Sequence, residues 1–174
     1  MKFSHIGVLI ASAVMAFGSF IVPATASAAG TQTVAAATKK APVRNKISFA
    51  GVTVPVVKGN MHVTSAPHAN VAQTWGGQTT LSTTDHQSTH MIGHNNTSFG
   101  KIVKLKKGSA VTVHDVNGKT RVYHVTKVLN VTDQGYINGT KTSVYKQIVN
   151  ANQGEQVVLQ TCLSETVNRL VWAR

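Results

Sequence analysis

From residue 46 onward the chain consists of short runs rich in β-branched residues, separated by turn-forming residues. No segment there carries a long apolar repeat of 3.6 residues, which an amphipathic helix requires. This pattern is typical of small, mostly β domains. The runs that predict strands cover residues 47–57, 89–92, 110–114, 119–131, 156–161 and 169–172.

The dipeptide Asn117-Gly118 lies between two of these runs. Both residues tolerate the positive φ of a tight hairpin turn, so strands over 109–115 and 119–129 are expected to pair antiparallel. Only two segments, 71–75 and 142–150, have a pattern that allows a short helix. The sequence therefore predicts a mainly β fold, a small barrel with one or two short helices.

The first 28 residues have the pattern of a secretory signal or of an N-terminal anchor. Lys2 precedes an apolar run over 6–22, and Ala-x-Ala sites follow at 24–26 and 26–28. The run is also near the lower length limit for spanning a bilayer. Both readings place the rest of the chain outside the cytoplasm, either secreted after cleavage or anchored at the outer face of the membrane.

The remainder of the chain predicts a spacer followed by one domain. Residues 29–45 are mostly Ala, Thr and Lys without hydrophobic periodicity, which indicates a flexible spacer. The domain is expected over 46–174, a length that suits one hydrophobic core.

The chain is strongly basic, with 17 Lys and Arg against 5 Asp and Glu and a formal charge of +12. Its lysines are scattered without interleaved aromatic residues, which does not favour nucleic acid. In an exported protein this charge predicts adhesion to anionic cell-wall polymers. With so few acids, calcium activation through Asp133 or Glu155 is not expected, and no cofactor is predicted. His86, His90 and His94 have helical metal-site spacing, but the residues between them disfavour a helix.

Cys162 is the only cysteine, so it cannot form an intramolecular disulfide. In an exported protein such a thiol is a small buried hydrophobe, a dimerising group or a nucleophile. All eight histidines precede Cys162. This order excludes papain-like enzymes, which place the cysteine before the histidine. L,D-transpeptidases place His before Cys in a compact motif, whereas His94 lies far upstream of Cys162.

The segments around Cys162 and His94 resemble the sortase signature. Residues 158–162, Val-Leu-Gln-Thr-Cys, are similar to the Thr-Leu-x-Thr-Cys strand of that family, with Val158 in place of Thr. Residues 93–95, Gly-His-Asn, resemble its upstream Gly-His segment. The family's arginine on the next strand matches Arg169 rather than Arg174, which is expected to be frayed at the terminus.

The resemblance implies a closed eight-stranded β-barrel that carries a cysteine transpeptidase site. In it, Cys162 is the nucleophile, His94 the general acid and base, and Arg169 stabilises the oxyanion or the substrate. Thr161 and His90 are expected to pack against these residues and to hold them in position.

Two tyrosines and two tryptophans have weaker assignments. Tyr136 and Tyr145 lie in the loop that shapes the sortase pocket, and they are candidate specificity residues. Trp75 and Trp172 are expected in the core, because large aromatic residues dominate burial in small domains.

The resemblance also implies the substrates. A Gram-positive surface protein with a sorting signal of the Leu-Pro-x-Thr-Gly type is cleaved after Thr and joined to an amine of peptidoglycan or of a pilin. Two alternatives stay open. One is a catalytically degenerate sortase-fold protein that binds anionic cell wall, and the other is a wall enzyme of the L,D-transpeptidase type.

Overall fold

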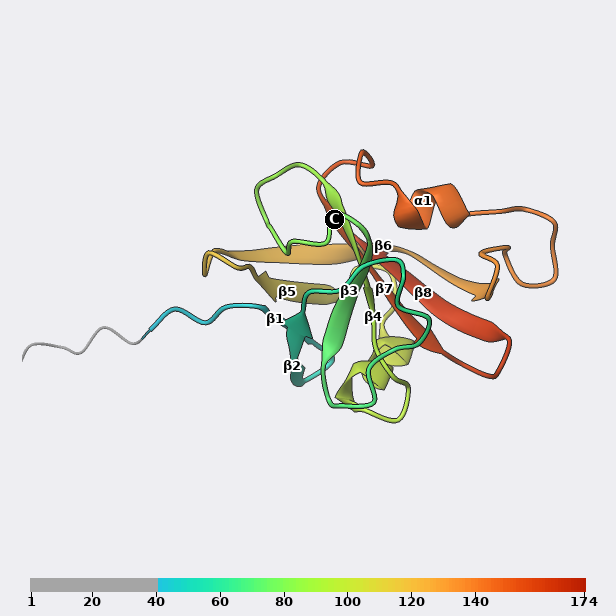
Figure 1. Ribbon diagram of the computed structural model, residues 1–174, viewed down its shortest axis with the longest axis horizontal. Coiled ribbons are helices and arrows are strands. Elements are labelled where there is room, and N and C mark those ends of the chain that lie inside the picture. The colour runs from blue at the N-terminus through green and yellow to red at the C-terminus, as the bar shows by residue number, and fades with distance from the viewer. Residues whose placement is uncertain (1–40) are drawn as a thin grey trace, which may run out of the picture. The chain divides into compact units, whose positions relative to one another are not determined.

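Eight strands and two short helices make up most of the structure, a computed structural model that describes residues 41–174 (Figure 1). The predicted signal or anchor, and the spacer up to residue 40, lie outside the described residues. Neither helix within 41–174 is long and apolar enough to cross a membrane. The elements are β1 (Lys46–Phe49), β2 (Val52–Val57), β3 (Ala72–Gly77), β4 (Ser88–Ile92), η1 (Ser98–Lys104, a 3-10 helix), β5 (Ala110–His114), β6 (Thr120–Thr132), α1 (Tyr145–Val149), β7 (Gln156–Cys162) and β8 (Val167–Ala173).

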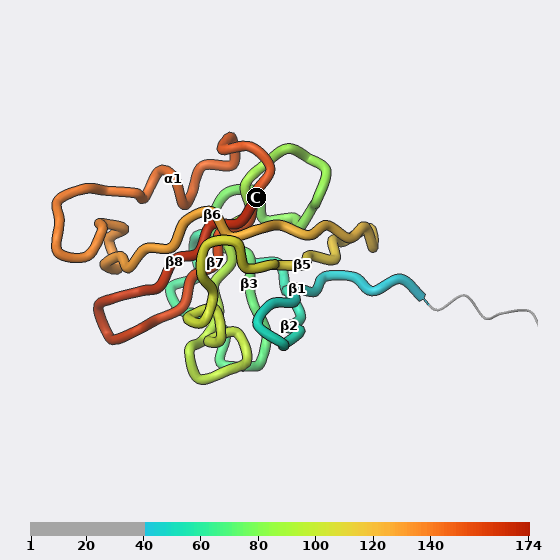
Figure 2. The backbone as a smooth tube through the Cα atoms, turned by 180° about the vertical axis from the view of Figure 1, so that it is seen from behind, coloured from blue at the N-terminus to red at the C-terminus, as the bar shows by residue number. Residues whose placement is uncertain are grey.

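The strands close into a barrel in the order β1-β2-β3-β4-β7-β8-β6-β5. The pairs β2–β3 and β4–β7 are parallel, and the other pairs are antiparallel. Closure pairs every strand on both sides, so no sheet edge is left open. Both backbone views show β7 beside β8 (Figures 1 and 2). The predicted mainly β barrel is confirmed.

The strands β7 and β8 are buried on both faces, which explains the unbroken apolar runs 157–159 and 170–173 within them. Val157 and Val171 pack in the larger hydrophobic cluster, whereas Val158 and Trp172 pack in a second one with residues of α1. Successive side chains of a strand point to opposite faces. We call the face that carries Val157 and Val171 the inner face, and the face that carries Val158 and Trp172 the outer face.

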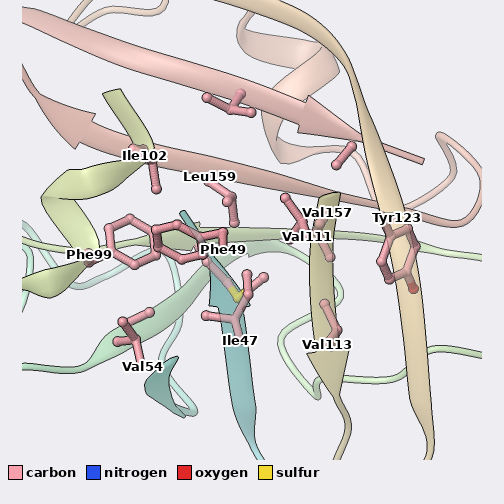
Figure 3. Close-up of a cluster of buried hydrophobic side chains, with 14 of the residues drawn as sticks. Ile47, Phe49, Val54, Phe99, Ile102, Val111, Val113, Tyr123, Val157 and Leu159 are labelled. Carbon is pink, nitrogen blue, oxygen red and sulfur yellow. The ribbon is translucent and has the colours of Figure 1, made fainter. Parts of the chain in front are cut away.

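The larger cluster is closed at one end by η1. Phe99 is fully buried and its ring meets that of Phe49 edge-to-face, with centroids 5.7 Å apart (Figure 3). Ile102 of the same helix is also fully buried beside Leu159 of β7. The helix η1 therefore fixes the loop that leaves β4, which is the loop that carries His94.

The predicted hairpin between β5 and β6 is confirmed, with Gly118 at φ 78°. Its turn is held by Asp115, a buried carboxylate that accepts hydrogen bonds from the backbone N–H groups of Asn117 (2.8 Å) and Lys119 (2.9 Å). Thr83 donates to the same carboxylate through its N–H and its hydroxyl. Burial alone raises the pKa of Asp115, but these four hydrogen bonds outweigh it and lower the pKa below its ordinary value.

One expectation about local structure is wrong. Residues 71–75 do not form a helix, because Ala72–Gly77 is strand β3, which pairs with β2 and β4 and alternates buried and half-buried side chains. Such a short segment has no intrinsic helical stability to resist this pairing. The run 47–57, expected to form opening strands, is the hairpin of β1 and β2, which turns at Ala50 and Gly51 with φ 45° and 76°.

Of the other local expectations, one is confirmed and one is wrong. The helix expected within 142–150 is confirmed as α1, whereas η1 was not predicted. The expected fraying of Arg174 is wrong, because its guanidinium donates to Gln156 Oε1 at 2.8 Å and to the Gln153 carbonyl at 3.2 Å. Its backbone also pairs with that of His124.

Replacing Phe99 tests whether η1 is a structural support of the barrel. Phe99→Ala removes a fully buried ring, and we expect it to lower the free energy of unfolding by about 3–5 kcal/mol. The matched control is Val103→Ala, which truncates a 41% exposed side chain of the same helix and should change stability by less than about 0.5 kcal/mol. Urea denaturation followed by tryptophan fluorescence measures both. Equal effects in the two variants would contradict this description of the core.

Candidate active site

One cavity of about 500 Å³ opens on the outer face, where β4 and β7 end. Its walls come from the β2–β3 loop, β3, the end of β4, the end of β6 and the loop after it, α1, the end of β7 and the start of β8. The lining combines apolar side chains with a few polar groups that can bind and react, as ligand sites commonly do. The lining residues used below are Val63, His68, Trp75, His90, Ile92, His94, Asp133, Tyr145, Gln160, Cys162 and Asn168.

Cys162 is the last residue of β7, and its side chain is exposed at the cavity. The residue before it, Thr161, is buried and donates a hydrogen bond from its hydroxyl to the carbonyl of Gly93 at 2.8 Å. The N–H of Gly93 in turn donates to the carbonyl of Gln160 at 3.2 Å. These bonds continue the parallel β4–β7 pairing by one residue, so they hold His94 next to the end of the cysteine strand.

Gly93 is required by the packing behind it. A Cβ at this position would lie 2.4 Å from the Phe99 ring, which is fully buried and has no room to move. The absence of a side chain lets the backbone of Gly93 approach η1 closely. The next residue, His94, is thereby aimed at the cavity.

The His94 ring is half-buried and lines the same cavity as Cys162. Its Nδ1 is buried without a hydrogen-bond partner, so no carboxylate orients this imidazole. Instead the ring packs against that of His68, with centroids 5.2 Å apart and planes tilted by 33°. The turn behind it is fixed by Thr97, whose hydroxyl donates to the His94 carbonyl at 2.8 Å.

His90 forms part of the cavity wall and cannot act as an acid there. Its side chain is fully buried and meets the Trp75 ring edge-to-face, with centroids 5.5 Å apart. Burial lowers the pKa of His90 from 6.5 to about 3, and the nearby Gln160 side chain offsets only part of this shift. Neither ring nitrogen has a partner with good hydrogen-bond geometry. His90 is therefore neutral at physiological pH.

Trp75 belongs to the cavity as well as to the packing around it. Its indole Nε1 donates to the Val63 carbonyl at 2.8 Å, which ties the β2–β3 loop to the cavity wall. The expectation that Trp75 is only a core residue missed this role. Trp172 is 3% exposed and lies in the core, as predicted.

Arg169 is not among the residues that line the cavity. The β7–β8 register sets Arg169 directly opposite Thr161, which is buried and lines the cavity, and the Arg169 Nε is buried without a hydrogen-bond partner. The residue opposite Cys162 is Asn168, which lines the cavity and donates from Nδ2 to Asp133 Oδ1 at 2.8 Å. Asn168 was not expected at the site, and Asp133 was considered only as a calcium ligand, whereas both line the cavity.

The two tyrosines differ in position. Tyr145 lines the cavity, whereas Tyr136 is exposed outside it and its backbone bridges to Ser143. Glu155 does not line the cavity. It accepts hydrogen bonds from the Tyr123 hydroxyl at 2.6 Å and from the N–H of His86. Within residues 41–174 no three or more His, Cys, Asp or Glu side chains gather as they would around a metal ion.

A sequence model of the sortase domain matches residues 46–174. The chain belongs to the sortase family. The family is one of cysteine transpeptidases, and the resemblance seen in the two motifs is thereby confirmed. No curated protein matches the chain by sequence.

Solved sortase structures share the fold. Sortase C1 from Streptococcus suis aligns with a TM-score of 0.56 at 17% identity, covering 75% of this chain and 71% of the other. Sortase C1 from Streptococcus agalactiae gives 0.55 at 18%, covering 79% and 69%. Sortase C from Clostridium perfringens gives 0.53 at 17%, covering 74% and 66%. The chain thus spans about two thirds of the length of these sortases.

The burial of His90 predicts a pH dependence of stability. Because the pKa of His90 is about 3 in the folded protein and ordinarily 6.5, only the unfolded chain binds this proton between those values. Acidification from pH 7 to 5 should therefore cost the unaltered protein about 2 kcal/mol more than His90→Phe. Urea denaturation at the two pH values measures the difference, with His62→Phe, an exposed histidine, as the control. Parallel losses in the unaltered protein and His90→Phe would contradict the neutral buried state.

Proposed function

We propose that this protein cleaves a sorting signal of the Leu-Pro-x-Thr-Gly type in an exported surface protein and transfers it to an amine of the cell wall or of a pilin. The observation that carries the proposal is the meeting of Cys162 and His94 in one cavity at the ends of two neighbouring strands. Cys162 is the only thiol of the chain, and it is exposed where a peptide can reach it.

In the first half of the reaction, the Cys162 thiolate attacks the carbonyl carbon of the scissile peptide bond. An Sγ–C bond forms and the carbonyl π pair moves to oxygen, which gives a tetrahedral oxyanion. When this intermediate collapses, the C–N bond breaks and His94 gives its proton to the leaving amine. The products are a thioester on Cys162 and the released C-terminal peptide.

In the second half, the acceptor amine attacks the thioester carbonyl. His94 takes the proton of the amine, the C–S bond breaks, and the thiolate of Cys162 is regenerated. Thioesters react readily with amines, which favours transfer over hydrolysis. The apolar part of the cavity lining, which includes Val63, Trp75 and Ile92, suits an extended peptide with apolar side chains.

The location and partners follow from the N-terminal pattern and the charge. The domain would act outside the cytoplasm, either secreted or held at the outer membrane face. Exposed lysines, including Lys101, Lys104 and Lys106, would hold it to anionic wall polymers. Arg169, opposite Thr161 on β8 and with a buried Nε that has no hydrogen-bond partner, would stabilise the oxyanion or the substrate.

Product analysis tests the proposal. The purified protein is incubated with a panel of sorting-signal peptides and with triglycine or a lysine peptide as the amine. We expect mass spectrometry to detect the ligated product, and Cys162→Ala or His94→Ala to lower its rate by about a thousandfold or more. His124→Ala, an exposed histidine on β6 that does not line the cavity, is the matched control and should keep the rate.

Other outcomes would point to other functions. Cleavage without transfer to any amine would indicate a hydrolase. A folded protein with neither activity, but with salt-sensitive adhesion to isolated cell wall, would favour the catalytically degenerate alternative.

A further inference from the structure

The His94 ring has no hydrogen bond that sets its direction. Its Nδ1 is buried without a hydrogen-bond partner, and the bond from the Thr97 hydroxyl reaches only the backbone carbonyl of His94. The terminal side-chain torsion of a histidine has broad, roughly two-fold preferences, so it does not by itself fix where the ring nitrogens point. The orientation of the His94 ring therefore depends on what packs against it.

His68 supplies the ring that packs against His94. It lies in the β2–β3 loop, residues 58–71, and the two ring centroids are 5.2 Å apart with planes tilted by 33°. This separation is within the range at which aromatic rings attract each other. Both histidines line the cavity at which Cys162 is exposed. The His68 ring thus limits the directions that the His94 ring can take beside the thiol.

Hydrogen bonds anchor the β2–β3 loop on both sides of His68. Before it, the Val63 carbonyl accepts a hydrogen bond from the Trp75 indole at 2.8 Å. After it, Asn70 Oδ1 accepts a hydrogen bond at 2.9 Å from the backbone N–H of Ser98, the first residue of η1. Since η1 directly follows the loop that leaves β4, the bond to Ser98 ties the two histidine-bearing loops together.

We propose that His68 is a positioning residue, whose ring holds the His94 imidazole in the orientation that proton transfer requires. This inference rests on the proposed function and names a further residue of the same site. A general acid or base transfers a proton only within hydrogen-bond reach, about 2.6–3.2 Å. His94 gives a proton to the leaving amine and takes one from the acceptor amine, so a misdirected ring slows both halves of the reaction. His68 itself exchanges no proton with the substrate.

Substitutions at His68 separate ring packing from two other roles. Packing needs a flat ring but no charge, and it acts on kcat because it serves the proton transfer. A charge effect on the site would need a cation but no ring. A direct contact with the peptide would change KM. His68 is an exposed residue, so its replacement removes no core packing.

The test measures kcat and KM with a fluorogenic Leu-Pro-x-Thr-Gly peptide and triglycine as the amine. His68→Ala should lower kcat by about threefold to tenfold, the value of one aromatic contact, and keep KM within about twofold. His68→Phe, which keeps a ring without a charge, should restore kcat to within about twofold of the unaltered protein. His68→Lys, which keeps a charge without a ring, should stay as slow as His68→Ala. His62→Ala, an exposed histidine of the same loop that does not line the cavity, is the matched control and should keep both constants.

A second measurement does not depend on activity. Nuclear Overhauser cross-peaks between the ring protons of His68 and His94 report the contact in solution. We expect these cross-peaks in the unaltered protein, and we expect His68→Phe to show them between its new ring and His94. Their absence from the folded, unaltered protein would contradict the ring contact itself.

Three kinetic results would overturn the inference. One is a kcat of His68→Ala within about threefold of the unaltered protein. Another is a loss that His68→Lys restores and His68→Phe does not, which would assign the effect to charge. The third is a rise in KM with kcat kept, which would assign His68 to peptide binding. If the unaltered protein transfers no peptide at all, the proposed function itself fails, and the role of His68 in it fails too. An active protein with an unaffected His68→Ala variant rejects this inference alone.

Discussion

The site depends on the parallel pairing of β4 with β7. This pairing sets Ile92 beside Gln160, and the Thr161 hydroxyl extends it through its hydrogen bond to the Gly93 carbonyl. Two segments far apart in the chain thus end side by side. Without this pairing, the histidine and the cysteine would have no common cavity. One strand register therefore brings the Gly-His and Thr-Cys segments together.

A second constraint is that β7 and β8 are buried on both faces. Each strand sends alternate side chains into two hydrophobic clusters, so the two-residue period decides which polar groups reach the cavity. The register places Cys162 opposite Asn168, with Thr161 and Arg169 as the next pair along the two strands. The same double packing limits movement, because shifting the register by one residue would bury polar groups in the core. The reactive group and its neighbour are therefore fixed by the packing of the barrel itself.

Features that depend on local chemistry could be predicted from the sequence. The Asn117-Gly118 turn, the β-rich pattern and the Gly-His and Thr-Cys segments each carry their own signal. Strand β3 was not predicted, because its stability comes from pairing with strands distant in the sequence. Asn168 carries no motif of its own, and only its register opposite Cys162 brings it to the cavity.

Transpeptidation at this cavity requires that Cys162 form a thioester with the substrate. The most direct measurement is the intact mass of the protein quenched in acid during reaction with a sorting-signal peptide, followed by mapping of the modified residue. We expect an added mass equal to that of the N-terminal part of the peptide. This mass should lie on Cys162 alone, and an added amine should remove it. Turnover of the peptide by Cys162→Ala at the rate of the unaltered protein, or an adduct on another residue, would contradict this mechanism.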